Sequence, residues 1–402
     1  MTKPDEPKPY EKKKVIVACQ GGGIHASFEV GVLSEILKDI QKQNRFELVG
    51  LSGTSAGALC TLMVWYGLAP KNTHPGSAPE AIDRLNRFWD TFAATRLPEK
   101  VLNLFAYSTF RAQEFETPIL GLNAPIFSLN PCGAISQAVT AALPLLRVRR
   151  QYFDLDELLS DTCSEFADID WPNLQTRLLV GATEVVNGIE TVFDSDCNMP
   201  NQGGKHDTAT VEVTQQWRER LPLSLDGVAA SGTLPQFLQA KEIDGRYYWD
   251  GLYSLNPPIR EFLAGVRKEH VPDEIWVVRI NPQQSAHRPQ SNSEIQDREN
   301  ELMGNLSLNK ELDFILKVNE WRLLPDAPAF TENYKHVTVR TIKMTQQTAA
   351  ELRYSSKFDR SLPFMDQLRR EGHAVAQDWL NRWPNVGSYP EDAAYWARRR
   401  VS

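Results

Sequence analysis

The stretch LVGLSGTSAGALCTLMVWYGLAP, residues 48–70, decides the fold of this chain. It starts as an apolar strand, passes through a cluster of small residues, and continues as an apolar helix over 56–68. The same order occurs upstream, where VIVAC (15–19) predicts a buried strand, QGGG interrupts it, and apolar residues at three- and four-residue steps predict a helix over 24–41. Two consecutive strand–helix units indicate an α/β fold, with a mainly parallel sheet covered by helices on both faces.

The small residues of this stretch form the sequence Gly53-Thr54-Ser55-Ala56-Gly57 at the predicted junction of strand and helix. A tight turn from strand to helix needs small neighbours and exposes a serine hydroxyl at the helix N-terminus, as in a nucleophile elbow. Ser55 is therefore a candidate nucleophile, and Gly53 and Gly57 are the glycines of the elbow. The alternative is a Gly/Ser turn that only packs a helix against a sheet.

The stretch 48–70 carries no charge and is long enough to span a bilayer. Two Ser, two Thr and four Gly interrupt it, however, and this favours a buried strand, turn and helix. The N-terminus is polar, and the apolar run at 15–19 is too short for the core of a signal peptide. We therefore expect a cytoplasmic protein, with at most peripheral contact at a membrane.

Gly21-Gly22-Gly23 follows the first predicted strand and has two interpretations. Together with Ala26, the glycines fit the G-x-G-x-x-A pattern of a dinucleotide-binding loop. That pattern expects an acid at the end of the second strand, but Glu47 precedes this strand. The other use of bare amide groups at a helix start is an oxyanion hole beside a nucleophilic serine, and we favour this interpretation.

A nucleophilic serine needs a base, and none of the seven histidines stands in a recognisable triad context. They are His25, His74, His206, His270, His287, His336 and His373. Asp250 in YYWDG lies between an aromatic strand end and a glycine that permits a sharp turn, so its carboxylate is a candidate base. Asp244, six residues earlier, sits in an Asp-Gly step typical of a β-hairpin turn and is expected to face water.

Four segments occur in the order typical of the patatin-like phospholipase family, and the chain resembles this family from about Val15 to Ile259. The segments are QGGGIHASFEVGVL, GLSGTSAG, VAASGTLPQF and YYWDGLYSLNPP. The resemblance implies a three-layer α/β/α fold and a Ser55–Asp250 dyad with an oxyanion hole at Gly21, Gly22 and Gly23. It also implies hydrolysis of acyl esters of lipids without a metal or an organic cofactor.

The sequence departs from the family pattern at three positions. His25 and Ala26 stand where the family usually has Arg or Lys and then Gly, and Leu252 replaces a small residue after the Asp-Gly step. Two alternatives to a lipid hydrolase with a dyad stay open. One is an esterase with a Ser-His-Asp triad, and the other is a regulated or non-catalytic effector on the same fold.

The chain is expected to comprise a polar tail (1–13), a patatin-like acyl hydrolase domain (14–283) and a mainly helical extension (284–402) packed on that domain. Within the domain, the proline-rich segment 97–150 reads as irregular and is a candidate cover over the site, with apolar stretches near Arg147, Arg149 and Arg150. Polar residues predict a loop over 283–300. Helices are expected at 307–323 and 362–383, with a strand at 336–342 between them.

Composition agrees with a globular enzyme. Hydrophobic residues make up 42% and charged residues 24% of the chain, which excludes a wholly disordered protein. The net charge of −7, without a block of like charge long enough to form an arm, argues against a nucleic-acid partner. Five widely spaced cysteines without a C-x-x-C pair are read as reduced packing residues. The expected partner is a lipid or another acyl ester, and the oligomeric state is not readable.

Overall fold

The computed structural model describes residues 12–114, 147–198, 217–235, 238–285, 288–289, 292–324 and 334–389. Both N-terminal strand–helix units form as the sequence predicts. Strand β1 (Lys13–Cys19) leads through the glycines and the 3-10 turn η1 (Gly23–Ala26) into α1 (Ser27–Lys42), and β2 (Phe46–Thr54) leads into α2 (Ala56–Leu68). Because β1 and β2 pair in parallel, both turns open at the carboxyl edge of the sheet.

One sheet joins all the described strands, in the order β5-β4-β3-β2-β1-β8-β9, with β7 pairing with β3 and β6 with β7. The further strands are β3 (Arg177–Glu184), β4 (Ile189–Asp194), β5 (Arg218–Pro222), β6 (Lys241–Ile243), β7 (Arg246–Asp250), β8 (Glu274–Arg279) and β9 (Thr338–Lys343). The five central strands from β3 to β9 run parallel, whereas β4 and β7 run antiparallel to β3. The expected mainly parallel sheet is therefore confirmed.

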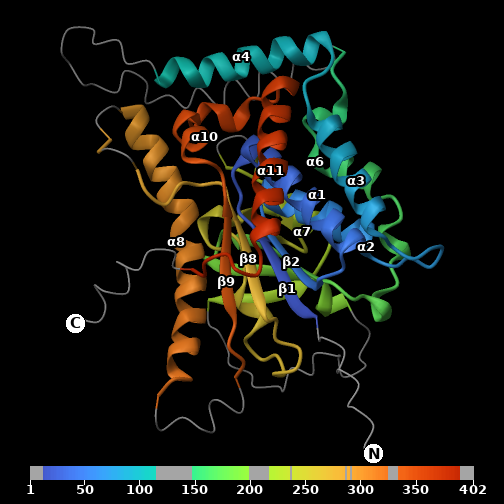
Figure 1. Cartoon of the computed structure of the whole chain (residues 1–402). Helices are drawn as coiled ribbons and strands as arrows, with labels where there is room; N and C mark the ends of the chain where they lie inside the picture. Colours follow the sequence, from blue (N-terminus) through green and yellow to red (C-terminus); the bar gives the residue numbers. More distant parts are fainter. Residues whose placement is uncertain are drawn as a thin grey trace, which may run out of the picture.

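The two faces of the sheet carry separate hydrophobic clusters, as the alternation of β1 requires. Val15, Val17 and Cys19 point to the cluster shared with α1 and α2, whereas Ile16 and Ala18 point to the cluster shared with α8. Figure 1 shows the helices around the sheet. The other α-helices are α3 (Ala78–Phe92), α4 (Leu97–Glu114), α6 (Leu155–Thr162), α7 (Leu225–Ser231), α8 (Asn292–Trp321), α10 (Gln346–Glu351) and α11 (Leu362–Arg382). This arrangement is the predicted three-layer α/β/α fold.

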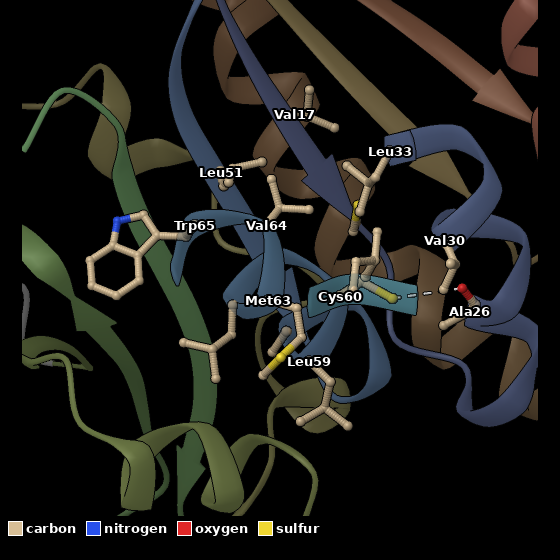
Figure 2. Close-up of a cluster of buried hydrophobic side chains, with 14 of the residues drawn as sticks. Val17, Ala26, Val30, Leu33, Leu51, Leu59, Cys60, Met63, Val64 and Trp65 are labelled. Atoms are coloured by element: carbon tan, nitrogen blue, oxygen red, sulfur yellow. Dashed lines mark hydrogen bonds between the residues drawn. The ribbon is translucent and has the colours of Figure 1, made fainter. Parts of the chain in front are cut away.

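Helix α2 is buried on all sides, which explains its uncharged sequence. The hydrophobic cluster that α2 shares with α1 and the sheet includes its residues Leu59, Met63 and Trp65 (Figure 2). The Cys60 thiol donates a hydrogen bond of 3.7 Å to the Ala26 carbonyl oxygen at the start of α1. In the part of the chain that the structure describes, no helix is long and apolar enough to cross a membrane.

Three segments differ from the sequence-based expectation. Residues 97–114, expected to be irregular, form α4, because Pro98 falls in the first turn, where a helix tolerates proline. Helix α8 begins at Asn292 inside the segment expected to be a loop. Strand β5 was not predicted, since its sequence RERLP is mostly polar and its pairing with β4 decides its conformation. The rest of the candidate cover, residues 115–146, lies outside the described residues.

Candidate active site

Ser55 occupies the sharp turn between β2 and α2. Its backbone has φ 56° and ψ −128°, a conformation that L-residues rarely adopt. Such strained backbone conformations cost energy and occur most often at functional sites. The neighbouring glycines are required by close approach of the backbone. A Cβ on Gly53 would lie 2.4 Å from the Gly57 carbonyl oxygen, and one on Gly57 would lie 2.6 Å from the Cys19 carbonyl oxygen. Ser55, Gly53 and Gly57 thus have the geometry of an elbow.

A second serine holds this turn in place. The Ser231 hydroxyl, at the end of α7, accepts a hydrogen bond of 2.9 Å from the Ser55 amide and donates one of 2.6 Å to the Gly181 carbonyl oxygen on β3. Ser231 is fully buried, so these bonds are not exchanged for water. It belongs to the segment VAASGTLPQF, where the sequence pointed to the family but not to this role.

The glycine loop lies directly beside Ser55. A Cβ on Gly21 would come within 2.8 Å of the Ser55 Cβ, so no larger residue fits there. The Gly21 amide donates a hydrogen bond of 2.6 Å to Oδ1 of Asn256. This amide is therefore occupied, so the loop amides that stay candidates for an oxyanion hole beside Ser55 are those of Gly22 and Gly23. Glu47, the acid that a dinucleotide site would require, lies at the amino end of β2, the opposite edge of the sheet.

Asp250 ends β7 and comes to the same edge of the sheet because β7 pairs with β3. Its amide donates to the Thr233 carbonyl oxygen at 2.9 Å. A Cβ on Gly251 would lie 2.4 Å from the Gly181 carbonyl oxygen, so the Asp-Gly step is pressed against β3. Asp244, by contrast, is exposed in the β6–β7 turn with a φ of 50°. The structure thus separates the two Asp-Gly steps as the sequence predicts.

The Asp250 carboxyl is fully buried, and burial raises its pKa from 3.8 to about 7. The Ser55 hydroxyl, a hydrogen bond of 2.8 Å from the Leu252 amide to Oδ1, and the charge of Lys357 lower the pKa again in part. Within the described residues, Oδ2 has no hydrogen bond of good geometry.

His25 does not supply a charge to the loop. Its Nε2 lies 2.7 Å from the Ser356 hydroxyl, and burial, followed by the charge of Lys357, holds its pKa well below 6.5. The cation next to the loop is Lys357, in the 3-10 turn η8 (Ser355–Phe358). Its Nζ donates to Oδ1 of Asn281 at 3.3 Å, and its carbonyl oxygen lies against Gly23. Sequence reasoning missed Lys357, since nothing in SSKFD distinguishes it.

Buried amide side chains connect the glycine loop to α8. Gln20 donates to Oδ1 of Asn305 at 3.1 Å and to the Gly304 carbonyl oxygen at 3.2 Å. Asn256 donates to the same carbonyl oxygen at 3.1 Å, and Asn281 donates to the Gly21 carbonyl oxygen at 3.1 Å. The segment expected to be an extension therefore braces the loop from outside.

Three further described histidines are His373, His74 and His336. His373 Nδ1 lies 2.9 Å from Glu35, and His74 interacts with Glu80. His336 opens the approach to β9, where burial lowers its pKa. The hydrogen bonds of His25, His74 and His373 go to residues other than Ser55 and Asp250. His206 and His287 lie outside the described residues.

Several known proteins resemble this chain. Among curated proteins none matches significantly. Among solved structures, VipD from Legionella pneumophila is 13% identical with a TM-score of 0.34, and the match covers 89% of this chain and 67% of the VipD chain. The type III effector ExoU is 12% identical with a TM-score of 0.28, and the match covers 92% of this chain and 54% of the ExoU chain. ExoU of Pseudomonas aeruginosa in complex with SpcU is 9% identical with a TM-score of 0.29, and the match covers 91% of this chain and 52% of that chain.

These structural similarities are too distant to carry a function, and the chain spans only about half of the ExoU chain. The family comparison is more extensive. The model of the patatin-like phospholipase family matches residues 17–263, more than half of the 402 residues. The chain therefore belongs to the patatin-like phospholipase family and is a hydrolase of ester bonds.

Proposed function

We propose that the chain hydrolyses acyl esters of lipids through a Ser55–Asp250 dyad. The observation that carries the proposal is the meeting of a strained serine at a strand–helix turn with a buried carboxyl whose pKa is raised to about 7. A base with a pKa near the working pH is both ionised often enough and basic enough to take a proton. Carboxylates with ordinary pKa values are much weaker bases.

In the proposed reaction, Asp250 takes the proton of Ser55 while the Ser55 oxygen attacks the ester carbonyl. The negative charge that forms on the carbonyl oxygen is met by the amides of Gly22 and Gly23. When the tetrahedral intermediate collapses, the alcohol leaves with the proton from Asp250 and the acyl group remains on Ser55. Asp250 then takes a proton from a water molecule as the water oxygen attacks the acyl carbonyl. When this second intermediate collapses, the bond to Ser55 breaks, the carboxylic acid leaves, and Asp250 returns the proton to the Ser55 oxygen.

A lipid substrate agrees with the family and places the enzyme at the surface of membranes or lipid aggregates while it works. No residue of the proposed dyad needs a metal or an organic cofactor for these steps. The C-terminal residues from about 284 onward are proposed as an extension of the hydrolase domain that braces the glycine loop through Gly304 and Asn305.

Labelling and turnover test the nucleophile together. Wild-type protein should react with a fluorophosphonate probe at Ser55, identified by mass spectrometry, and should hydrolyse short- and long-chain acyl esters. Ser55→Ala should prevent labelling and lower turnover at least about a thousandfold, since the covalent route is lost. Ser164→Ala, at an exposed serine, is the matched control. Substantial hydrolysis by folded Ser55→Ala protein would contradict the proposal, and a folded wild type without activity on any ester would favour the effector alternative.

A further inference from the structure

Four apolar side chains of helix α4 point outward. Leu97, Val101, Leu104 and Phe105 are 75%, 57%, 63% and 55% exposed, respectively. At 100° per residue these four side chains fall within an arc of about 100° on one face of the helix. We call this face the α4 stripe. A helix that buried its apolar face against the protein would show the opposite pattern.

Polar contacts on the inner face hold α4 in this orientation. Glu99 is fully buried, forms an ion pair of 2.6 Å with Arg149, and accepts hydrogen bonds from the amides of Thr95 and Arg96. One turn further, Asn103 donates to Asp359 at 2.9 Å and accepts from the Arg360 amide at 2.8 Å. Turning the stripe inward would break these bonds and leave buried charges unpaired, so the outward orientation is built into the fold.

The exposed charged residues between positions 95 and 111 have one sign. Arg96, Lys100 and Arg111 are exposed, and the single acidic residue between positions 95 and 111 is the buried Glu99. At 100° per residue these three cations fall along one edge of the stripe. An apolar stripe with cations along one edge fits the interface of a bilayer that contains anionic lipids, where the apolar side chains enter the acyl region and the cations meet the phosphates. A protein partner would not need this separation of apolar and basic side chains.

The stripe also lies on the side of the molecule that carries the site. Helix α4 packs on η8, and η8 packs on the glycine loop. Figure 1 shows α4 lying across one end of the molecule, beside α10 and α11, whereas the C-terminal end of α8 lies at the opposite end. A bilayer seated on α4 would therefore be close to the loop and not behind the sheet.

We propose that the α4 stripe is the surface through which this hydrolase docks on anionic phospholipid bilayers. The inference rests on the proposed lipid hydrolysis for its purpose, but binding can be measured without turnover. The test uses Ser55→Ala protein, which cannot consume its substrate by the proposed route. Its co-sedimentation is measured with vesicles of phosphatidylcholine and with vesicles of phosphatidylcholine and phosphatidylglycerol in equal parts.

Leu97→Ser/Leu104→Ser should weaken binding to the anionic vesicles by tenfold to about a hundredfold, because two leucines no longer enter the apolar region. Lys100→Glu should weaken it by about tenfold, with little effect on phosphatidylcholine alone, and added salt should reduce the difference. The matched control is Leu323→Ser/Leu324→Ser, at two leucines that are 83% and 55% exposed and follow directly after the C-terminal end of α8. The control should bind as the parent protein does.

Several results would overturn the inference. The first is equal binding by Leu97→Ser/Leu104→Ser and by the control Leu323→Ser/Leu324→Ser, and the second is binding that does not depend on lipid charge or on Lys100. A lower melting temperature of Leu97→Ser/Leu104→Ser would mean that another part of this chain covers the stripe. A changed oligomeric state of this variant would mean that a second copy of the chain covers it. With Ser55 intact, the double variant should hydrolyse vesicular lipid more slowly relative to a soluble short-chain ester. A wild type that binds vesicles but hydrolyses no ester would refute the proposed function and leave the docking surface standing.

Discussion

Replacing Asp250 with asparagine should abolish hydrolysis and, at alkaline pH, make the folded protein more stable. Asparagine keeps the shape of the side chain and can still accept the hydrogen bond from the Leu252 amide, but it has no carboxylate to take a proton. Turnover should therefore fall nearly as far as in Ser55→Ala. In the wild type, kcat/KM should rise with pH around a midpoint near 7, since only the ionised carboxyl acts as the base.

The effect on stability follows from the raised pKa. Burial moves the pKa of Asp250 from 3.8 to about 7, so the folded protein holds this proton more tightly than the unfolded chain does. Stability is fully retained below the unfolded pKa and is lost as the pH rises from about 4 to about 7. Between pH 5 and pH 8 the wild type should lose about 2 to 3 kcal/mol through this group, at about 1.4 kcal/mol per pKa unit. The asparagine side chain of the variant cannot ionise, so Asp250→Asn avoids the loss.

Urea unfolding of both proteins at pH 5, 6.5 and 8 measures this difference. The stability of Asp250→Asn relative to wild type should increase by about 2 to 3 kcal/mol from pH 5 to pH 8. Asp244→Asn, in the exposed hairpin turn, should retain most activity and should not reproduce this increase. A stability difference that does not change with pH would refute the raised pKa. Hydrolysis retained by Asp250→Asn, or an equally severe loss in a His270, His287, His336 or His373 variant, would refute the dyad.

Three further predictions concern the surroundings of the dyad. Ser55→Gly should be more stable than Ser55→Ala by about 1 kcal/mol in urea unfolding, although both are inactive, because glycine relieves the strained φ of 56°. Lys357→Met should move the midpoint of the pH–rate profile upward, because the charge of Lys357 lowers the pKa of Asp250. Lys357→Arg should restore the midpoint, and an unchanged midpoint in Lys357→Met would contradict this coupling. Asn305→Leu should remove one of the two acceptors of the Gln20 amide and leave it only the Gly304 carbonyl oxygen. This variant should lose about 1 to 3 kcal/mol of stability and should lower kcat more than it changes KM, whereas a normal kcat would show that the brace does not position the loop.

The sequence by itself determined the parts of this protein that depend on neighbouring residues. The strand–helix units, the elbow at Ser55 and the difference between the hairpin acid Asp244 and the strand-end acid Asp250 were all predicted. Their signals are short apolar runs, small residues at tight turns and Asp-Gly steps, which act over a few residues. Local conformation was misjudged where two local signals conflicted, as with the proline in the first turn of α4.

Only the tertiary structure decided which distant side chains surround the site. Lys357 reaches the glycine loop from more than 300 residues away, Asn256 takes the Gly21 amide, and Asn305 of α8 braces Gln20. The outward orientation of α4 depends in the same way on Arg149 and on the η8 region. These contacts form because the parallel sheet brings the ends of separate strands to one edge, where buried polar groups must find partners. A single polar residue in the sequence carries no sign of which partner that will be.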